Sequence, residues 1–334
     1  MIHSASILLI AFALDFLLGD PPYRLHPIRL LGSSVSILEK LLRGLGLSGL
    51  LGGMLLVTFV VGLSLTIYLA AHSFLVGLHP WLATILDIYL VYSCLALTDL
   101  LGHAVPVAMA LERSDLIQAR VTLQSMVGRD TSLLDSAGVA RGAVESVAEN
   151  FVDGVVSPLF WYSAGAILCL ILRCRAPAAA GVSAILIFKV ISTLDSMVGY
   201  RHEHYLLFGR PAARLDDLAN FIPARLSLII LFVGAAISRE SAMAGWKIAR
   251  RDRLKHLSPN AGHPESFVAG TLGIKLGGPV LYQEETVEKP WLGDEDEEVG
   301  PDHIRRCCRL IYRSSWVALL LFSASLLSMS FLFS

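Results

Sequence analysis

The chain has 334 residues, of which 54% are hydrophobic and 16% are charged, and its mean hydropathy is +0.63. Soluble proteins usually carry about 25% charged residues, so this composition argues against a soluble enzyme and is typical of an integral membrane protein. The net charge of −1 gives no basis for nucleic-acid binding. The five cysteines form neither a CxxC pair nor a Cys/His metal spacing, and we expect no disulfide framework.

The N-terminal apolar run, Ile7 to Leu18, predicts an uncleaved membrane segment, because no Lys or Arg precedes it and no small-residue cleavage site follows. It contains Asp15 and ends at Gly19-Asp20-Pro21-Pro22, where two prolines turn the chain. His26 and Arg29 come next. These polar residues either cap the segment at the headgroup boundary or form a functional site, since an acid inside the membrane is costly.

The apolar runs predict an all-α, polytopic membrane bundle with about five to seven membrane segments. Leu50 to Ala71 and Trp81 to Leu101 are each about 20 residues long, enough to cross a bilayer, and their short link predicts a hairpin. The later runs are Val155 to Leu172, Ala178 to Ile191, Leu226 to Ile237 and Trp316 to Phe333. We expect one domain over residues 1–334, with a polar surface segment at 283–315 and a C-terminal membrane helix at 316–333.

Lys and Arg gather in segments 24–43, 113–141, 201–225 and 239–275, which the positive-inside rule places on the cytoplasmic side. If every apolar run crossed once, the last basic segment would lie opposite the others. We therefore expect that either Ala178–Ile191 or Leu226–Ile237 does not cross. The latter, at about 12 residues, is tilted, re-entrant or extended back through Ile222.

The stretch Ala140 to Asp153 has the pattern of a two-faced helix, and it follows a predicted surface helix at Glu112 to Arg120. Its charged residues recur every four positions and fan along one side beside Ser146: Arg141, Glu145, Glu149 and Asp153. The other side is apolar: Val144, Val147, Ala148 and Phe151. Either this is a solvated amphipathic helix with ion pairs, or its polar face binds metal or phosphate.

Two later segments offer further charged groups. Lys189 shares a helical face with three hydroxyl residues, and it either extends toward the headgroups or contacts an anionic ligand beside Asp195. Arg214, Asp216 and Asp217 form either an ion-pair network or the carboxylate pair that a phosphate-bridging Mg²⁺ requires.

The segment 239–282 combines a basic run with two loops. Arg250 to His256 is basic and can meet anionic lipid headgroups. The Pro/Asn/Gly string Ser258 to Glu265 and the sequence Gly277-Gly278-Pro279 predict loops of defined shape. No GxxxxGK[ST] motif occurs, which excludes a P-loop. The acidic run Asp294 to Glu298 reads as solvated surface.

Four motifs together carry a resemblance to a known family: LLGDPPYRLHPIRLLG, ARGAVESVAENFVDGVVSPLFW, FKVISTLDSMVGYRHEHYLLFGRPAARLDDLANFIPARLS and SPNAGHPESFVAGTLGIKLGGPVLY. The chain closely resembles the adenosylcobinamide-phosphate synthase (cobinamide synthase) family of cobalamin biosynthesis, also called CobD/CbiB. The resemblance runs from about Leu14 to Tyr282, with the motifs in the family's order. One departure is His263, where a Trp is expected in many relatives.

The resemblance implies an ATP-dependent acid–amine ligase that uses Mg²⁺. Its reaction joins a propionate carboxyl group of adenosylcobyric acid, a corrinoid, to the amine of (R)-1-aminopropan-2-ol or its O-phosphate. The family further implies a protein surrounded by lipid in the inner (plasma) membrane of a bacterial or archaeal cell. Its active site is expected to face the cytoplasm. Other corrinoid-pathway proteins are candidate partners.

Such chemistry requires metal-bound phosphates, positive charge on the transferred phosphoryl group, and a base for the attacking amine. We assign metal binding to Glu145, Glu149, Asp153 and Asp195, with Asp216 or Asp217 as second choices. We assign phosphate binding to Arg141, Lys189, Arg201, Arg214 and Arg225, and orientation of substrate groups to Asn150, Asn260 and His263. The base is Glu149 or Asp217, and Glu145 and Asp195 complete the catalytic set. We expect these residues to converge at the inner rim of the helical bundle.

Two other functions remain as alternatives. A transporter would place polar residues near the centres of its membrane segments, whereas most here lie at segment ends and in loops. A non-catalytic membrane sensor on the same scaffold would have lost the acidic cluster, which this chain retains.

Overall fold

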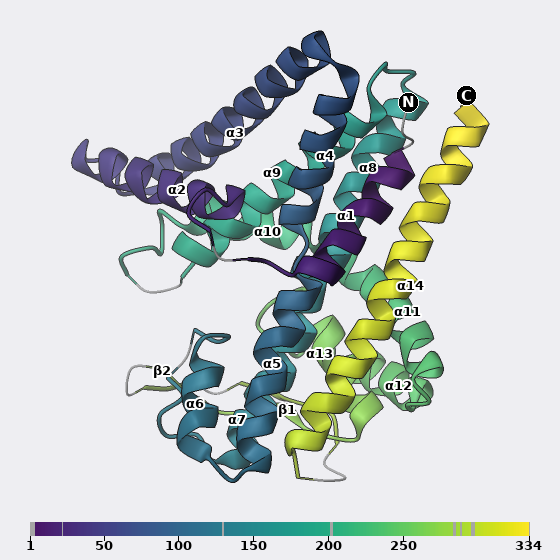
Figure 1. Cartoon of the computed structure of the whole chain (residues 1–334). Helices are drawn as coiled ribbons and strands as arrows, with labels where there is room; N and C mark the ends of the chain where they lie inside the picture. Colours follow the sequence, from purple (N-terminus) through teal and green to yellow (C-terminus); the bar gives the residue numbers. More distant parts are fainter. Residues whose placement is uncertain are drawn as a thin grey trace. The chain divides into compact units, whose positions relative to one another are not determined.

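The computed structural model describes residues 4–21, 23–128, 130–200, 203–282, 285–287, 289–294 and 298–333, apart from the side chains of 280–282 and 285–287. The described chain is mostly helical with four very short strands, which confirms the predicted all-α class (Figure 1). It forms two compact units. Unit 1 comprises Met1–Ala96, Ser157–Ala219 and Leu319–Ser334, and unit 2 comprises Leu97–Val156 and Asn220–Ala318. The single predicted domain stays a prediction.

Membrane-spanning length is found in five helical stretches of the described chain: Leu50–Leu78, Pro80–Glu112, Ser136–Ile171, Pro177–Val198 and Pro301–Phe333. The helices Arg210–Ala219 and Phe221–Ile237 together form a sixth candidate. The protein is therefore a polytopic membrane protein, within the predicted range of segments. Because the second of these two helices begins at Phe221, the run predicted from Leu226 does extend backward through Ile222.

Unit 1 is built from seven helices and the end of an eighth. They are α1 (Ser4–Leu18), α2 (Pro27–Gly44), α3 (Leu50–Leu78), α4 (Pro80–Cys94), α8 (Ser157–Ile171), α9 (Pro177–Val198), α10 (Arg210–Ala219) and the last part of α14 (Pro301–Phe333). The predicted hairpin is confirmed, since only His79 separates α3 from α4 (Figure 1). The His79 side chain accepts a hydrogen bond from the Trp81 amide and so caps α4.

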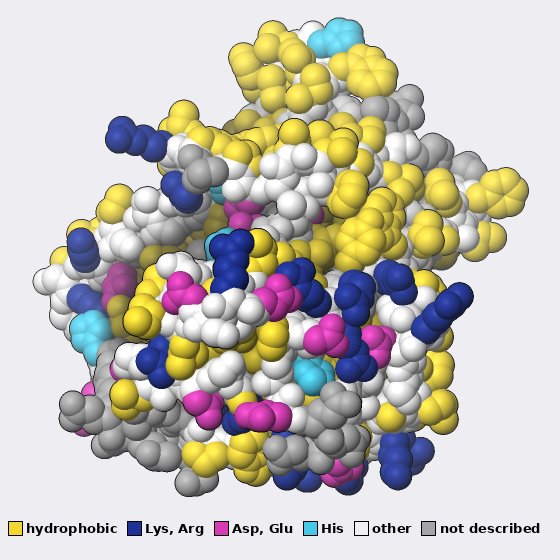
Figure 2. Space-filling view, turned by 60° about the horizontal axis from the view of Figure 1, so that its bottom comes forward, with side chains coloured by type: hydrophobic (Ala, Val, Ile, Leu, Met, Phe, Trp, Pro, Cys, Tyr) yellow, Lys and Arg dark blue, Asp and Glu magenta, His cyan; other side chains and the backbone are white. Residues whose placement is uncertain are grey.

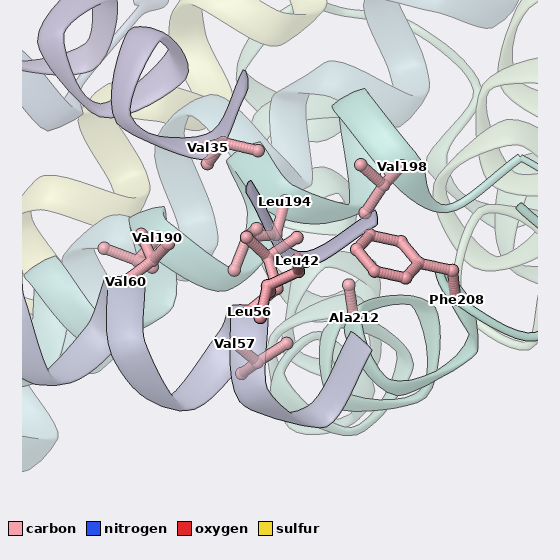
Figure 3. Close-up of a cluster of buried hydrophobic side chains, with 10 residues drawn as sticks. All are labelled: Val35, Leu42, Leu56, Val57, Val60, Val190, Leu194, Val198, Phe208 and Ala212. Carbon is pink, nitrogen blue, oxygen red and sulfur yellow. The ribbon is translucent and has the colours of Figure 1, made fainter. Parts of the chain in front are cut away.

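An apolar cluster joins four helices of unit 1 (Figure 3). Its buried members come from α2, α3, α9, α10 and the segment before α10: Val35, Leu42, Leu56, Val57, Val60, Val190, Leu194, Val198, Phe208 and Ala212. Leu194 and Val198 flank Asp195 along α9, so burial of their side chains fixes the end of the helix that carries this predicted site residue.

Unit 2 contains the remaining elements of the described chain. They are α5 (Leu97–Glu112), α6 (Leu116–Gln124), α7 (Ser136–Phe151), the π-turn η1 (Val152–Val156), α11 (Phe221–Ile237), α12 (Ala242–Asp252), α13 (Gly262–Leu272), β1 (Leu276–Gly277), β2 (Val280–Tyr282), β3 (Glu285–Val287), β4 (Trp291–Leu292) and the first part of α14. Strand β1 pairs antiparallel with β4, and β2 with β3.

Helix α13 is the centre of unit 2, because every one of its residues is buried. Helix α12 packs closely on it at Gly245, where an added Cβ would lie 2.2 Å from Thr271 Oγ1. Only glycine permits this approach of the two backbones. The contact fixes the basic end of α12 beside the start of α13.

Two predicted boundaries differ from the structure. The surface helix predicted at Glu112 to Arg120 is wrong in its limits: α5 ends at Glu112, and α6 starts at Leu116 because Asp115 caps it through a hydrogen bond from the Gln118 amide. The C-terminal helix starts at Pro301, earlier than the predicted 316.

Candidate functional site

The two-faced helix predicted around residue 145 is confirmed as α7. Asp135 caps it by accepting a hydrogen bond of 2.7 Å from the Gly138 amide. The apolar face is fully buried at Val144, Val147, Ala148 and Phe151. Opposite them, Arg141, Glu145 and Asp153 are half-buried, and Glu149 and Asn150 are exposed. Burial of one face therefore anchors a row of charged side chains that solvent can reach.

The end of this row departs from α-helical geometry. Asp153 lies in the π-turn η1, which joins α7 to α8 without a break. A π-turn adds one residue to a helical turn, and such turns occur frequently at functional sites. The carboxylate of Asp153 is therefore rotated out of the strict four-residue register that the sequence pattern suggested.

A glycine turn packs against the first half of the charged row. The Gly277 amide donates a hydrogen bond of 2.7 Å to Glu145 Oε1. The Arg141 guanidinium lies 4.8 Å from the centre of the Trp291 ring, in a cation–π contact. Gly278 has a φ of +80°, and an added Cβ would lie 2.3 Å from the same ring. The loop predicted at 277–279 thus holds Arg141 and Glu145 through β1 and β4. Trp291 was missed in the sequence, because nothing local to it marks a partner so distant in the chain.

The second loop, Ser258 to Glu265, forms the N-terminal approach to α13. Ser258 Oγ accepts hydrogen bonds from the Asn260 and Ala261 amides, and the Ser258 amide donates to His256 Nδ1. Burial, and then the positive charge of Lys289, lower the pKa of His256, whereas Glu145 opposes this effect. The lowered pKa favours the neutral form of the His256 imidazole.

A pocket of about 440 Å³ lies at the junction of α11, α12 and α13. Its lining residues are Arg225, Leu228, Trp246, Ala249, Arg250, Arg253, Leu254 and His263. Arg225 Nη1 lies 3.4 Å from Asn260 Oδ1. The structure thus brings together Arg225, Asn260 and His263, three residues predicted to bind substrate. Arg250 and Arg253 were read in the sequence as lipid contacts, and their place in the pocket was missed.

His263 is buried in this pocket with 1% of its surface exposed. Burial and the nearby guanidinium groups of Arg225 and Arg253 lower its pKa from 6.5 to about 4. The imidazole is therefore neutral at pH 7. Figure 2 shows acidic and basic side chains mixed over the face of the molecule that is turned forward in that view.

Five of the predicted site residues lie in unit 1. Lys189 and Asp195 are half-buried on α9, and Arg214, Asp216 and Asp217 lie on α10. Arg201 lies outside the described residues.

The metal and catalytic assignments stay predictions. Glu145, Glu149 and Asp153 belong to unit 2, whereas Asp195, Asp216 and Asp217 belong to unit 1. Among the residues that the structure describes, no group of three or more His, Cys, Asp or Glu side chains is arranged to hold a metal ion. Convergence of the two sets is likewise a prediction.

Unit 1 contains two polar clusters, one near the N-terminus and one in the α3–α4 hairpin. His26 pairs with Asp20 at 2.9 Å and also caps α2 through the Ile28 amide, which favours the cap interpretation of this motif. Inside the α3–α4 hairpin, Asp87 accepts a hydrogen bond of 2.8 Å from the Tyr68 hydroxyl and lies 3.4 Å from His72 Nε2.

Comparison with known proteins gives a consistent result over nearly the whole chain. The sequence model of the family described as CobD/Cbib protein matches residues 8–311. The chain is 40% identical over 316 residues to the cobalamin biosynthesis protein CobD of Klebsiella pneumoniae subsp. pneumoniae, covering 94% of each chain. It is 39% identical over 319 residues to the cobalamin biosynthesis protein CbiB of Salmonella paratyphi B, covering 95% of each. No solved structure matches the chain.

Proposed function

We propose an activity for this chain, which belongs to the CobD/CbiB family and has a role in cobalamin biosynthesis. It forms the amide bond between adenosylcobyric acid and (R)-1-aminopropan-2-ol or its O-phosphate. The acid supplies one propionate carboxyl group of the corrinoid. ATP supplies the driving force, and the reaction takes place on the cytoplasmic side of the membrane.

The chemistry sets what the site has to provide. A carboxylate does not react with an amine at neutral pH, so its oxygen first attacks the γ-phosphorus of ATP, and ADP leaves. The amine then attacks the acyl carbon, inorganic phosphate leaves, and a base takes the proton from nitrogen. Positive side chains offset the charge of the transferred phosphoryl group. Magnesium, when bound, neutralises the phosphate oxygens.

Each unit carries side chains of the types that this chemistry uses. In unit 1, helices α9 and α10 carry the carboxylates Asp195, Asp216 and Asp217, and carboxylate oxygens are ligands that magnesium accepts. In unit 2, the three arginines of the pocket offer guanidinium groups that match phosphate geometry. Our candidate magnesium ligands are Asp195 with Asp216 or Asp217 in unit 1 and, in unit 2, Glu145, Glu149 and Asp153.

The strongest support for the proposal is the way α7 is held: its apolar face is packed into the core, and its charged face contacts the glycine turn at Gly277. Glu145 is fixed by the Gly277 amide. Glu149, one turn further, is exposed and able to reach a substrate. The fixed carboxylate of Glu145 suits the orientation of a substrate, and the accessible carboxylate of Glu149 suits proton transfer. We assign the base role to Glu149, with Asp217 as the alternative.

The test is amide formation by the purified protein in nanodiscs. It receives adenosylcobyric acid, ATP, Mg²⁺ and either the amine or its O-phosphate, and mass spectrometry follows the corrinoid product. We expect ADP release that requires both corrinoid and amine, and a loss of about 100-fold or more in Glu149→Gln. Glu298→Gln, which changes an exposed acid of the same unit, is the matched control and should retain activity.

A transport function is the alternative, and the buried Asp87 favours it. Acids inside membrane segments frequently belong to proton or substrate paths. A transporter needs two compartments, whereas an amide synthase works in detergent micelles. Product formation in micelles would support the synthase, and corrinoid uptake into sealed vesicles without product would support the transporter.

A further inference from the structure

The pocket between α11, α12 and α13 carries positive charge that no carboxylate of the described residues neutralises. Within the described chain, Arg225, Arg250 and Arg253 make no ion pair with a carboxylate. Arg225 donates to the Phe221 carbonyl and lies over the Phe221 ring, and Arg253 reaches the Arg250 carbonyl at 3.3 Å.

Three other arginines of unit 2 do have carboxylate partners. Arg251 pairs with Asp252 and Asp294, Arg305 pairs with Glu112, and Arg306 pairs with Glu240. Arg225, Arg250 and Arg253 instead surround one cavity without a carboxylate partner among the described residues, and three guanidinium groups in such an arrangement attract an anion.

A buried imidazole points to the same conclusion. His263 lines the pocket with 1% of its surface exposed, and its Nδ1 has no hydrogen-bond partner among the described residues. A buried polar atom without a partner is rare in a folded protein and marks a place where a ligand or water completes the bonding. Because the ring is neutral at pH 7, one of its nitrogens carries a hydrogen that it can donate to an anion.

The walls of the pocket also offer apolar surface to a ligand. Leu228, Trp246 and Leu254 line the same pocket and make much of its surface apolar. A neighbouring pocket of about 520 Å³ shares Trp246 and Arg250 and continues along α12 to Met243 and Lys247. A ligand that fills both has a multiply charged anionic end and an apolar or aromatic part.

We propose that this pocket binds a phosphate ester, with the phosphate on Arg225, Arg250 and Arg253 and the apolar part against Trp246. Three guanidinium groups match a dianion or a polyphosphate better than a single carboxylate, and the guanidinium fork fits phosphate oxygens. Two sources supply this chemistry: a soluble ester, either a nucleoside triphosphate or a phosphorylated amino alcohol, and an anionic phospholipid. The choice of soluble candidates rests on the proposed function.

Direct binding separates these sources. The full-length protein in nanodiscs of zwitterionic lipid is titrated with ATP and with the O-phosphate of 1-aminopropan-2-ol by calorimetry. In a parallel arm, native mass spectrometry counts anionic phospholipid retained from mixed micelles. We expect one of the three ligands to bind, and Arg250→Ala and Arg253→Ala each to weaken its binding about tenfold or more, because each removes charge-assisted hydrogen bonds.

The controls keep the result interpretable. Arg113→Ala removes an exposed arginine of the same unit that does not line the pocket and should bind as wild type does. The Arg250 side chain is exposed, so its variant should fold normally, and unchanged melting temperature checks this. Arg253→Lys keeps the charge but loses the fork and should fall between wild type and Arg253→Ala.

The inference and the proposed function can fail separately. Ligand binding that depends on Arg250 and Arg253 without amide formation would sustain the pocket and refute the synthase. Amide formation with unchanged binding in both variants would refute the pocket and sustain the synthase. Binding of none of the three ligands to the wild-type protein would also overturn the inference.

Discussion

Neutralising Asp252 should loosen the end of α12, which carries Arg250 and leads directly into Arg253, two arginines of the pocket. Its carboxylate is 0% exposed and receives hydrogen bonds of 2.8 Å from both Arg251 Nε and Nη2, while Lys255 Nζ lies at 2.6 Å and the Gly293 amide at 2.9 Å. Removing one partner of a buried ion pair costs about 3 to 5 kcal/mol. The Arg251 and Lys255 side chains are 44% and 45% exposed, so water screens both, and we take the lower end, about 3 kcal/mol.

The variant Asp252→Asn is measured by thermal unfolding in detergent, where a loss of this size lowers Tm by about 6 to 12 °C. Asp294→Asn is the matched control, since its carboxylate binds the same Arg251 but is 62% exposed, and it should cost under about 1 kcal/mol. Equal losses in the two variants, or no loss in Asp252→Asn, would refute the reasoning.

The pH dependence of stability gives an internal check on the contribution of the Asp252 ion pairs. Burial alone would raise the pKa of Asp252, but hydrogen bonds from Arg251, Lys255 and the Gly293 amide hold it well below its usual range. A depressed carboxyl pKa stabilises the fold fully above the unfolded value of about 3.9, and this contribution is lost as pH falls through the folded pKa. The difference between wild type and Asp252→Asn should therefore shrink below about pH 4.

Three further changes test other parts of the structure. Gly278→Ala should displace the Trp291 ring, because Gly278 has a positive φ and no room for a Cβ. The free energy of unfolding should fall by about 1–2 kcal/mol or more, and turnover should fall with it. Unchanged Tm and turnover would contradict this. The lowered pKa of His263 means that the unfolded chain binds a proton that the folded chain does not. Stability should therefore fall by up to about 3 kcal/mol as pH drops from 6.5 to 4, and a pH series of Tm in His263→Asn should show a smaller fall. Tyr68→Phe leaves the Asp87 carboxylate with one hydrogen bond fewer and should cost about 1–3 kcal/mol, whereas an unchanged unfolding curve would show that this bond adds nothing to the α3–α4 hairpin.

Periodic features of the fold were predictable from the sequence. The four-residue spacing of Arg141, Glu145 and Glu149 located the accessible face of α7, because a helix turns about 100° per residue. The apolar length of α3 and its short link to α4 fixed the hairpin. In both cases the determining information is local to one helix or one turn.

Features that depend on distant partners were not predictable. Trp291 holds Arg141 across about half of the chain, and only the β1–β4 pairing brings them together. The start of α14 at Pro301 was hidden because Arg305 and Arg306 look like solvated surface in sequence, whereas each pairs with a distant glutamate. Likewise, a basic run cannot reveal which of its arginines face a pocket until packing against α13 is known.

Isotope transfer tests the central claim most directly. Adenosylcobyric acid is labelled with ¹⁸O in the reacting carboxyl group and incubated with the purified protein, ATP, Mg²⁺ and the amine. Activation by phosphoryl transfer predicts that one ¹⁸O atom appears in inorganic phosphate, in step with ADP and the amide product. Label found in AMP, or amide formed without nucleotide consumption, would contradict the account.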